Sequence, residues 1–128
     1  MRLLLDTHVF IWLMLDSKRL SQAAIDAIRD PDNRVCLSAA SAWELAIKQS
    51  LGKLQLPAPA PEWVPLACQQ GGIELMHLSA DAALRVHGLP WHHRDPFDRL
   101  LIAQAAQGLT VVTHDRAFKD YDLSVLWA

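Results

Sequence analysis

Short apolar runs alternate along this chain with segments in which apolar residues recur at helical spacing. Residues 3–5 are three consecutive leucines that lead into Asp6, and a run without polar alternation is typical of a strand buried on both faces. Similar runs and spacings predict the other elements. The further predicted strands are residues 34–37, 73–78, 109–113 and 123–127, and the predicted helices are residues 9–15, 22–29, 38–51, 62–70, 79–87 and 96–107.

Strands that alternate with helices predict an α/β fold, in which right-handed crossovers join the strands of a parallel sheet. A chain of 128 residues fits one domain, and no linker, repeat or low-complexity tract divides residues 1–128. The hydrophobic fraction of 52% and the charged fraction of 20% favour an ordered globule. The net charge of -2 gives no global basic field, so a nucleic acid would have to be held by local cations or through metal ions.

Cysteine usage and the first residues indicate where the protein works. Cys36 and Cys68 lie among apolar residues, and we expect both to be buried free thiols in a reducing compartment. The apolar N-terminal run is interrupted by Asp6 and His8 and lacks a small-residue cleavage site, unlike a signal peptide. No stretch approaches the length of a membrane span. The expected location is therefore the cytoplasm, with no membrane partner.

Four acidic residues recur where predicted strands end. Asp6, Asp98 and Asp115 fall at or just after the carboxyl ends of strands or in the first turn of the following helix, and Glu44 lies near the start of the helix after the second strand. These positions share one edge of a parallel sheet, the edge at which open α/β sheets place their ligands. We therefore expect the four side chains to meet in one cleft.

Each acid also has an ordinary structural explanation. Asp6 could simply end a strand, residues 41–44 match a Ser-x-x-Glu capping box, Asp95 and Asp98 suit a helix start, and Asp115 could cap a turn. Taken together, these explanations are weaker, because capping alone gives no reason to gather four carboxylates in one cleft. Like charges ~5 Å apart at an effective dielectric of ~20 repel by about 3 kcal/mol per pair. Such a cluster either raises carboxylate pKa values or requires a bound cation.

An all-oxygen cluster favours Mg²⁺ or Mn²⁺ over zinc. The chemistry that follows is metal-assisted hydrolysis of a phosphodiester, in which the ion activates water and stabilises charge on the leaving oxygen. Asp6 and Asp98 are the expected direct ligands, and Glu44 and Asp115 complete the shell directly or by orienting water. Asp95 is a further possible ligand, although its position suits an N-cap better.

Side chains beside the acid motifs are candidate substrate contacts. The basic ones could hold RNA phosphates or form ordinary salt bridges, and the hydroxyls could contact substrate, the carboxylates or local backbone. His93 could reach substrate at the mouth of the cleft or make only local loop contacts. The basic candidates are Lys48, Arg94, Arg99 and Arg116, and the hydroxyl candidates are Thr7 and Thr113.

The other histidines and the tryptophans give weaker signals. A zinc site at His92 and His93 is disfavoured, because adjacent histidines point in different directions and no cysteine pair has zinc spacing. Trp91 is the best candidate for stacking on a base. Trp12 and Trp43 are expected to fill the interior or a dimer interface.

The chain resembles the PIN-domain toxins of the VapC family, the ribonuclease half of type II toxin–antitoxin pairs. The resemblance spans nearly all of the sequence, and the order and spacing of its motifs are more specific than any one of them. The third motif, His93–Ala105, is long enough to be specific. The four matching stretches are residues 3–8, 38–44, 93–105 and 112–115, the last with Phe118 and Tyr121 downstream.

The resemblance implies a three-layer α/β/α fold with a parallel sheet of about five strands, the first of them central. It also implies a Mg²⁺ or Mn²⁺ site, cleavage of single-stranded RNA, a homodimer, and a cognate antitoxin whose tail blocks the cleft. Asp95 and Asp98 both lie in the third motif, and the main role is assigned to Asp98 because it leads into the helix.

Two other classes of protein fit parts of the sequence. A haloacid-dehalogenase-type phosphatase also begins with an apolar strand and an aspartate, but it carries a second aspartate two residues later, where this chain has His8. A non-catalytic module that binds RNA or protein would use the acids only as helix caps. If the protein were such a module, adding metal would change neither its stability nor its activity.

Overall fold

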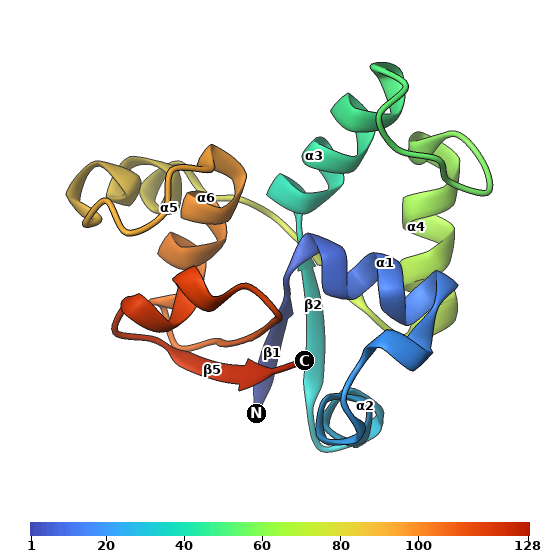
Figure 1. Cartoon of the computed structure of the whole chain (residues 1–128), viewed down its shortest axis with the longest axis horizontal. Helices are drawn as coiled ribbons and strands as arrows, with labels where there is room; N and C mark the ends of the chain where they lie inside the picture. The colour runs from blue at the N-terminus through green and yellow to red at the C-terminus, as the bar shows by residue number, and fades with distance from the viewer.

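The computed structural model describes residues 1–128 and contains one parallel sheet of five strands (Figure 1). The strand order is β3-β2-β1-β4-β5, so β1 is central and every neighbouring pair is parallel. The predicted parallel sheet with its first strand in the centre is confirmed. The strands are β1 (Arg2–Leu5), β2 (Arg34–Ser38), β3 (Glu74–Met76), β4 (Thr110–Thr113) and β5 (Ser124–Trp127).

Helices cover both faces of the sheet and give the predicted three layers (Figure 1). None of these helices is both long enough and apolar enough to cross a lipid bilayer. The α-helices are α1 (Thr7–Leu15), α2 (Gln22–Arg29), α3 (Ala39–Ser50), α4 (Ala60–Gly71), α5 (Ala80–Arg85) and α6 (Pro96–Ala105), and the short 3₁₀ helices are η1 (Ser17–Arg19), η2 (Val86–Gly88) and η3 (Arg116–Asp120).

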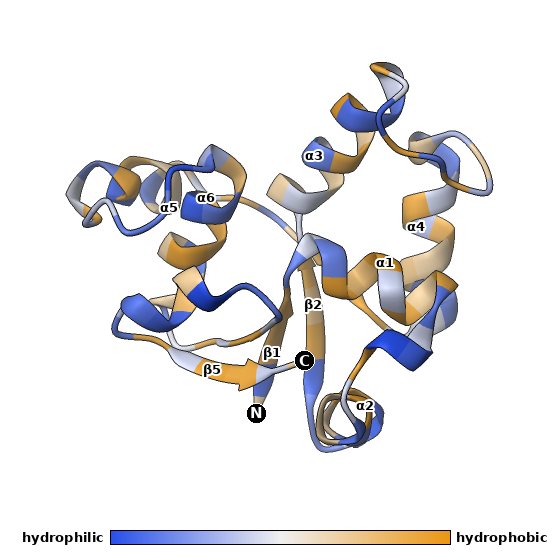
Figure 2. Cartoon of the chain, viewed as in Figure 1, coloured by the Kyte–Doolittle hydropathy of each residue, from blue (hydrophilic) through white to orange (hydrophobic).

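The three leucines of β1 explain why this strand is central. Leu3 and Leu5 pack into the hydrophobic core on one face of the sheet, whereas Leu4 packs into the core on the other face. Successive side chains of a strand point to opposite faces, so a strand covered by helices on both sides must be apolar throughout. All three leucines are fully buried, and the strands at the centre of Figure 2 are largely hydrophobic.

The structure differs from the predicted elements mainly at their ends. Helix α4 begins at Ala60 instead of residue 62, since Pro61 stands in its first turn, where a missing N–H breaks no helical bond. Strand β3 has only three residues because it pairs on one side alone, at the edge of the sheet. Helix α6 ends at Ala105, and the chain turns through Gly108 with a φ of 104°.

Four helices begin at the carboxyl ends of the sheet's strands or close to them. Their N-caps are Asp6 for α1, Ser38 for α3, Asp95 for α6 and Asp115 for η3. Because the strands are parallel, the N-termini that follow them gather at one edge, as predicted for the acidic residues. This edge carries the functional site.

Candidate metal centre

Asp6 stands where β1 passes into α1, with its backbone N–H donating to the carbonyl of Val112 at 3.0 Å. It occupies the N-cap position of α1, yet its side chain makes no capping hydrogen bond. Instead, Oδ2 accepts a hydrogen bond of 2.8 Å from the Thr113 hydroxyl at the end of β4. The carboxylate is buried and held by the neighbouring strand, which leaves Oδ1 for another partner.

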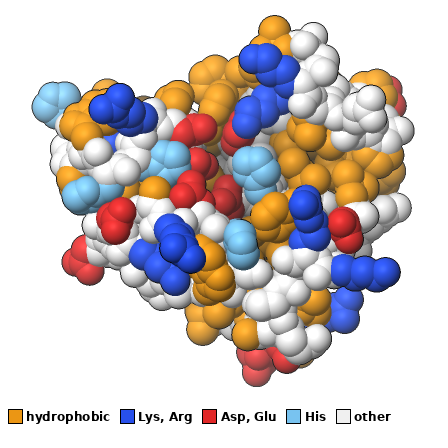
Figure 3. Space-filling model, viewed as in Figure 1, with side chains coloured by type: hydrophobic (Ala, Val, Ile, Leu, Met, Phe, Trp, Pro, Cys, Tyr) orange, Lys and Arg blue, Asp and Glu red, His pale blue; other side chains and the backbone are white.

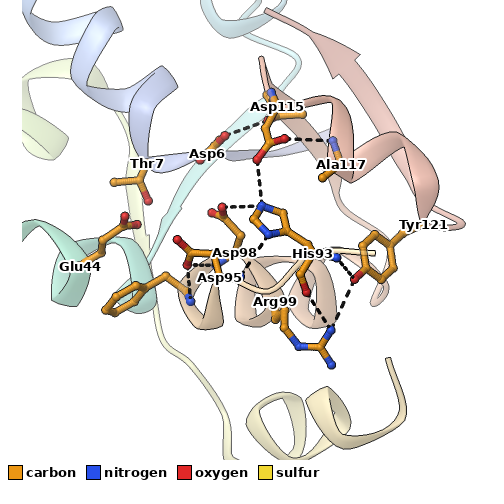
Figure 4. Close-up of polar contacts among 12 residues, drawn as sticks. Asp6, Thr7, Glu44, His93, Asp95, Asp98, Arg99, Asp115, Ala117 and Tyr121 are labelled. Carbon is orange, nitrogen blue, oxygen red and sulfur yellow. Dashed lines mark hydrogen bonds and ion pairs between the residues drawn. The ribbon is translucent and has the colours of Figure 1, made fainter. Parts of the chain in front are cut away.

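The two aspartates of α6 have separate tasks. Asp95 is the N-cap, and its Oδ1 accepts hydrogen bonds from the backbone N–H groups of Phe97 at 2.8 Å and Asp98 at 3.2 Å. The side chain of Asp98 caps nothing and lies among the acids of the site (Figure 4). The helix-start explanation therefore accounts for Asp95 but not for Asp98.

The capping-box explanation of Glu44 does not hold in the structure. Ser38 caps α3 by accepting from the N–H of Ala40, whereas Ser41 lies inside the helix and accepts from the Thr7 hydroxyl at 2.8 Å. Glu44 is buried, with Oε2 paired to Lys48 one turn later, and this hydrogen bond raises the pKa of Lys48. Its other oxygen, Oε1, is buried without any hydrogen-bond partner.

Asp115 is joined to Asp98 through His93 (Figure 4). One oxygen of Asp115 caps η3 by accepting from the N–H of Ala117, and the other lies 2.9 Å from Nε2 of His93. The same Nε2 lies 2.9 Å from Oδ2 of Asp98. Since Nδ1 of His93 accepts from the N–H of Asp95 at 3.2 Å, Nε2 carries the proton that the two carboxylates share.

The structure thus gathers the four predicted acids, Asp6, Glu44, Asp98 and Asp115, in what we call the acidic cleft. The space-filling view shows acidic side chains gathered in a hollow near the centre of the face (Figure 3). Burial, followed by the charges of the four neighbouring carboxylates, raises the pKa of Asp98 to about 8. Burial also raises the pKa of Asp6, against the effect of the hydrogen bond from Thr113.

These features fit a bound divalent cation. Buried carboxylates that repel one another need a positive charge, and the unpartnered Oε1 of Glu44 needs a hydrogen-bond donor or an ion. The donors are mainly carboxylate oxygens, which suit hard cations. Ligand atoms of His93, Asp98 and Asp115 also lie within 4.8 Å of one another. The proton on Nε2 assigns His93 to orienting these two carboxylates, while their oxygens are the atoms available to an ion.

The remaining predicted residues divide into two groups. Three of them contact acids of the cleft directly, namely Thr113, Lys48 and His93. Thr7 contacts Ser41 of α3, the helix that carries Glu44. Arg94 and Arg116 are exposed and form no ion pair within the chain, so both cations are free to contact a substrate. The sequence left open whether His93 reaches substrate at the mouth of the cleft or makes local contacts; in the structure its ring lies between Asp98 and Asp115.

Arg99 faces away from the acidic cleft and is only 2% exposed. Its guanidinium donates to four backbone carbonyls of the preceding loop and lies 3.5 Å from the Tyr121 hydroxyl, while the ring of Trp91 covers it at 3.7 Å. A buried side chain so engaged fixes the loop that carries His93 and is not presented to a phosphate. The four carbonyls belong to Val86, Leu89, Pro90 and His93.

Comparisons with known proteins agree with this architecture. The PIN domain profile matches residues 3–123. Ribonuclease VapC22 of Mycobacterium tuberculosis is 32% identical over 92% of this chain and 90% of its own length. Ribonuclease VapC16 of the same organism is 43% identical over 60 residues, covering 47% of this chain and 41% of that protein.

Two solved structures have a similar fold at lower sequence identity. VapBC2 from Rickettsia felis, bound to a promoter DNA fragment, has a TM-score of 0.70 at 17% identity, with 99% of this chain and 98% of that chain covered. VapBC-1 from nontypeable Haemophilus influenzae has a TM-score of 0.70 at 19% identity, with 98% and 97% covered.

Acids at the carboxyl edge of a parallel sheet, arranged for a divalent cation, suit metal-assisted hydrolysis of a phosphate ester. The chain belongs to the PIN-domain family, together with the VapC ribonucleases. It is accordingly a ribonuclease, an enzyme that hydrolyses phosphodiester bonds, and divalent-metal dependence is general for this family.

Replacing Arg99 by lysine should lower the free energy of unfolding by about 2–4 kcal/mol, because three ammonium donors cannot serve the buried carbonyls that the planar guanidinium reaches. Urea unfolding measures the change. Arg85→Lys is the matched control, since Arg85 is exposed on α5 and pairs only with Asp81, and it should change stability little. Equal effects of the two substitutions would show that Arg99 does not hold the loop.

The raised pKa of Asp98 predicts how the metal-free protein responds to pH. The native state keeps a proton that the unfolded state releases near pH 4, so stability falls as pH rises from about 4 to about 8. Asp98→Asn removes this loss. At pH 8.5 the free energy of unfolding of the chelator-treated variant should exceed that of wild type by at least about 2 kcal/mol, and at pH 4 the two should be alike. Urea unfolding tests this against Asp122→Asn, an exposed control. A difference independent of pH would refute the assignment.

Proposed function

We propose that the chain is the toxin of a type II toxin–antitoxin pair and an endoribonuclease that cuts single-stranded RNA at the acidic cleft. The observation that carries the proposal is the buried, unpartnered Oε1 of Glu44 beside the raised-pKa carboxyl of Asp98. Neither feature stabilises a metal-free fold, and both are accounted for if a divalent cation belongs in the cleft. A module whose acids only cap helices would need neither.

In this proposal Asp6 and Asp98 bind the ion directly, and Glu44 and Asp115 complete its surroundings. Asp95 stays the N-cap of α6, because its Oδ1 already accepts from two backbone N–H groups. Mg²⁺ is the ion that oxygen donors favour, and Mn²⁺ is the alternative. When bound, such an ion supplies an activated water and stabilises the charge that develops on the scissile phosphate.

The other side chains hold this arrangement and meet the RNA. Thr113 orients Asp6, Lys48 orients Glu44, and His93 sets the positions of Asp98 and Asp115 through its shared proton. Thr7 supports α3 through Ser41. The exposed cations Arg94 and Arg116 contact RNA phosphates, which matters in a chain whose net charge of -2 supplies no general attraction.

The family supports further proposals about partners. The similar solved structures are VapBC complexes, so we infer a cognate antitoxin that covers the acidic cleft, and we also infer a homodimer. Residues 1–128 act as a single PIN domain. The two free, buried cysteines, Cys36 and Cys68, suit the reducing cytoplasm, where RNA substrates are found.

Purified protein should cleave a mixed single-stranded RNA pool with Mg²⁺ or Mn²⁺ and not with chelator. Asp6→Asn, Glu44→Gln and Asp98→Asn should each lower the rate at least about 100-fold, because each removes charge that would stabilise the ion or the transition state. Gel analysis of the products measures the rate, and thermal melting checks the fold of each variant. Asp122→Asn, at an exposed position, should cleave like wild type. Equal cleavage by all variants would mean that the acidic cleft is not the catalytic site.

A further inference from the structure

A second hollow opens beside the acidic cleft. This cavity has a volume of about 250 Å³ and is lined by Asp6, His8, Trp12, His114 and Asp115; we call it the ring pocket. It shares Asp6 and Asp115 with the acidic cleft, so a group in the ring pocket would lie next to the carboxylates proposed to hold the ion. Its other three walls are aromatic rings.

These rings belong to a longer series that runs away from the acids. The ring centroids of His8 and Trp12 are 6.2 Å apart, and those of Trp12 and His114 are 5.7 Å apart in an edge-to-face arrangement. His114 then stacks on Trp127 at 4.8 Å with an interplanar angle of 30°. Residues from α1, the end of β4 and the end of β5 thus present one continuous aromatic surface.

Two cations lie over this surface. The guanidinium carbon of Arg19 is 5.1 Å from the ring centroid of Trp12, and Nζ of Lys119 is 4.1 Å from the ring centroid of Trp127. Both side chains are exposed, and neither forms an ion pair with an acid of the chain. Their charges are therefore available to a negatively charged ligand that follows the rings.

Exposure distinguishes this cluster from ordinary core packing. His8 and His114 are exposed and Trp12 and Trp127 are half-buried, whereas a packing cluster would enclose its rings. Pale-blue histidines lie directly beside the red carboxylates on the face seen in Figure 3, with blue basic side chains near them. The stack on Trp127 also holds the His114 ring in place before any ligand arrives.

We propose that the ring pocket binds a nucleobase of the RNA strand, next to the phosphate that the acidic cleft cleaves. The base would stack on the imidazoles of His8 and His114, and Arg19 and Lys119 would contact the flanking phosphates. This inference rests on the proposed ribonuclease function. Every base has an aromatic face and a phosphate beside it, so planar rings interleaved with cations match single-stranded nucleic acid better than they match an extended peptide.

The test compares a fluorescent oligoadenylate with a ribose-phosphate chain of the same length that carries no bases. Both are titrated with the Asp98→Asn protein in Mg²⁺, so that the RNA is not consumed, and binding is followed by anisotropy. The otherwise unchanged protein should bind the oligoadenylate about tenfold more tightly than the chain without bases. His8→Ala and His114→Ala should each reduce this preference. His114→Phe should keep it, because the phenyl ring can stack on a base as the imidazole does.

The matched control is His87→Ala, which removes an exposed histidine from η2, outside the ring pocket. It should keep the preference. The proposal would be overturned if the unaltered pocket bound the oligoadenylate and the chain without bases equally, or if the preference survived both histidine substitutions. A peptide such as the antitoxin tail would then be the better candidate ligand for the rings. Because cleavage by the protein with Asp98 intact is measured separately, this failure is distinguishable from loss of the ribonuclease function.

Discussion

Buried negative charge is the constraint on which the functional part of this molecule depends. Asp6 and Glu44 are buried carboxylates and Asp98 is half-buried, and burial together with repulsion from its neighbours raises the pKa of Asp98 to about 8. A fold does not gain stability from such a cluster unless a cation neutralises it. The acidic cluster lowers stability at one edge of the sheet, and the large hydrophobic core around the fully apolar central strand offsets this loss.

The surroundings of the cluster hold each carboxylate in place, and they leave one oxygen of Asp6 and one of Glu44 without a hydrogen-bond partner from the chain. Asp6 is held by Thr113, Glu44 by Lys48, and Asp115 by the N–H of Ala117. His93 reaches Asp98 and Asp115 together, and Arg99 fixes the loop from which His93 projects. The acids therefore depend on contacts that lie outside the acidic motifs.

The fold and the acids were predictable because their signals are local. The Leu3–Leu5 run indicated a buried strand, and the position of Asp98 in the first turn of a predicted helix indicated the cleft edge. The tasks of His93 and Arg99 were not predictable, because they depend on contacts across the loop and with Tyr121. Trp91, which remains exposed, covers the guanidinium of Arg99, a contact that no periodicity indicates; its expected stacking on a base stays a prediction.

Crystals of the wild-type protein soaked in Mn²⁺ and measured for anomalous scattering would locate the ion. The arrangement of the acids requires a peak in the acidic cleft, roughly 2.2 Å from oxygens of both Asp6 and Asp98, with Glu44 facing it. His93 should then still bond to a carboxylate and not to the metal. Saturating Mn²⁺ that leaves the cleft without a peak, or a peak bonded to the His93 nitrogen away from Asp6, would show that the buried carboxylates are not a metal centre of the kind described.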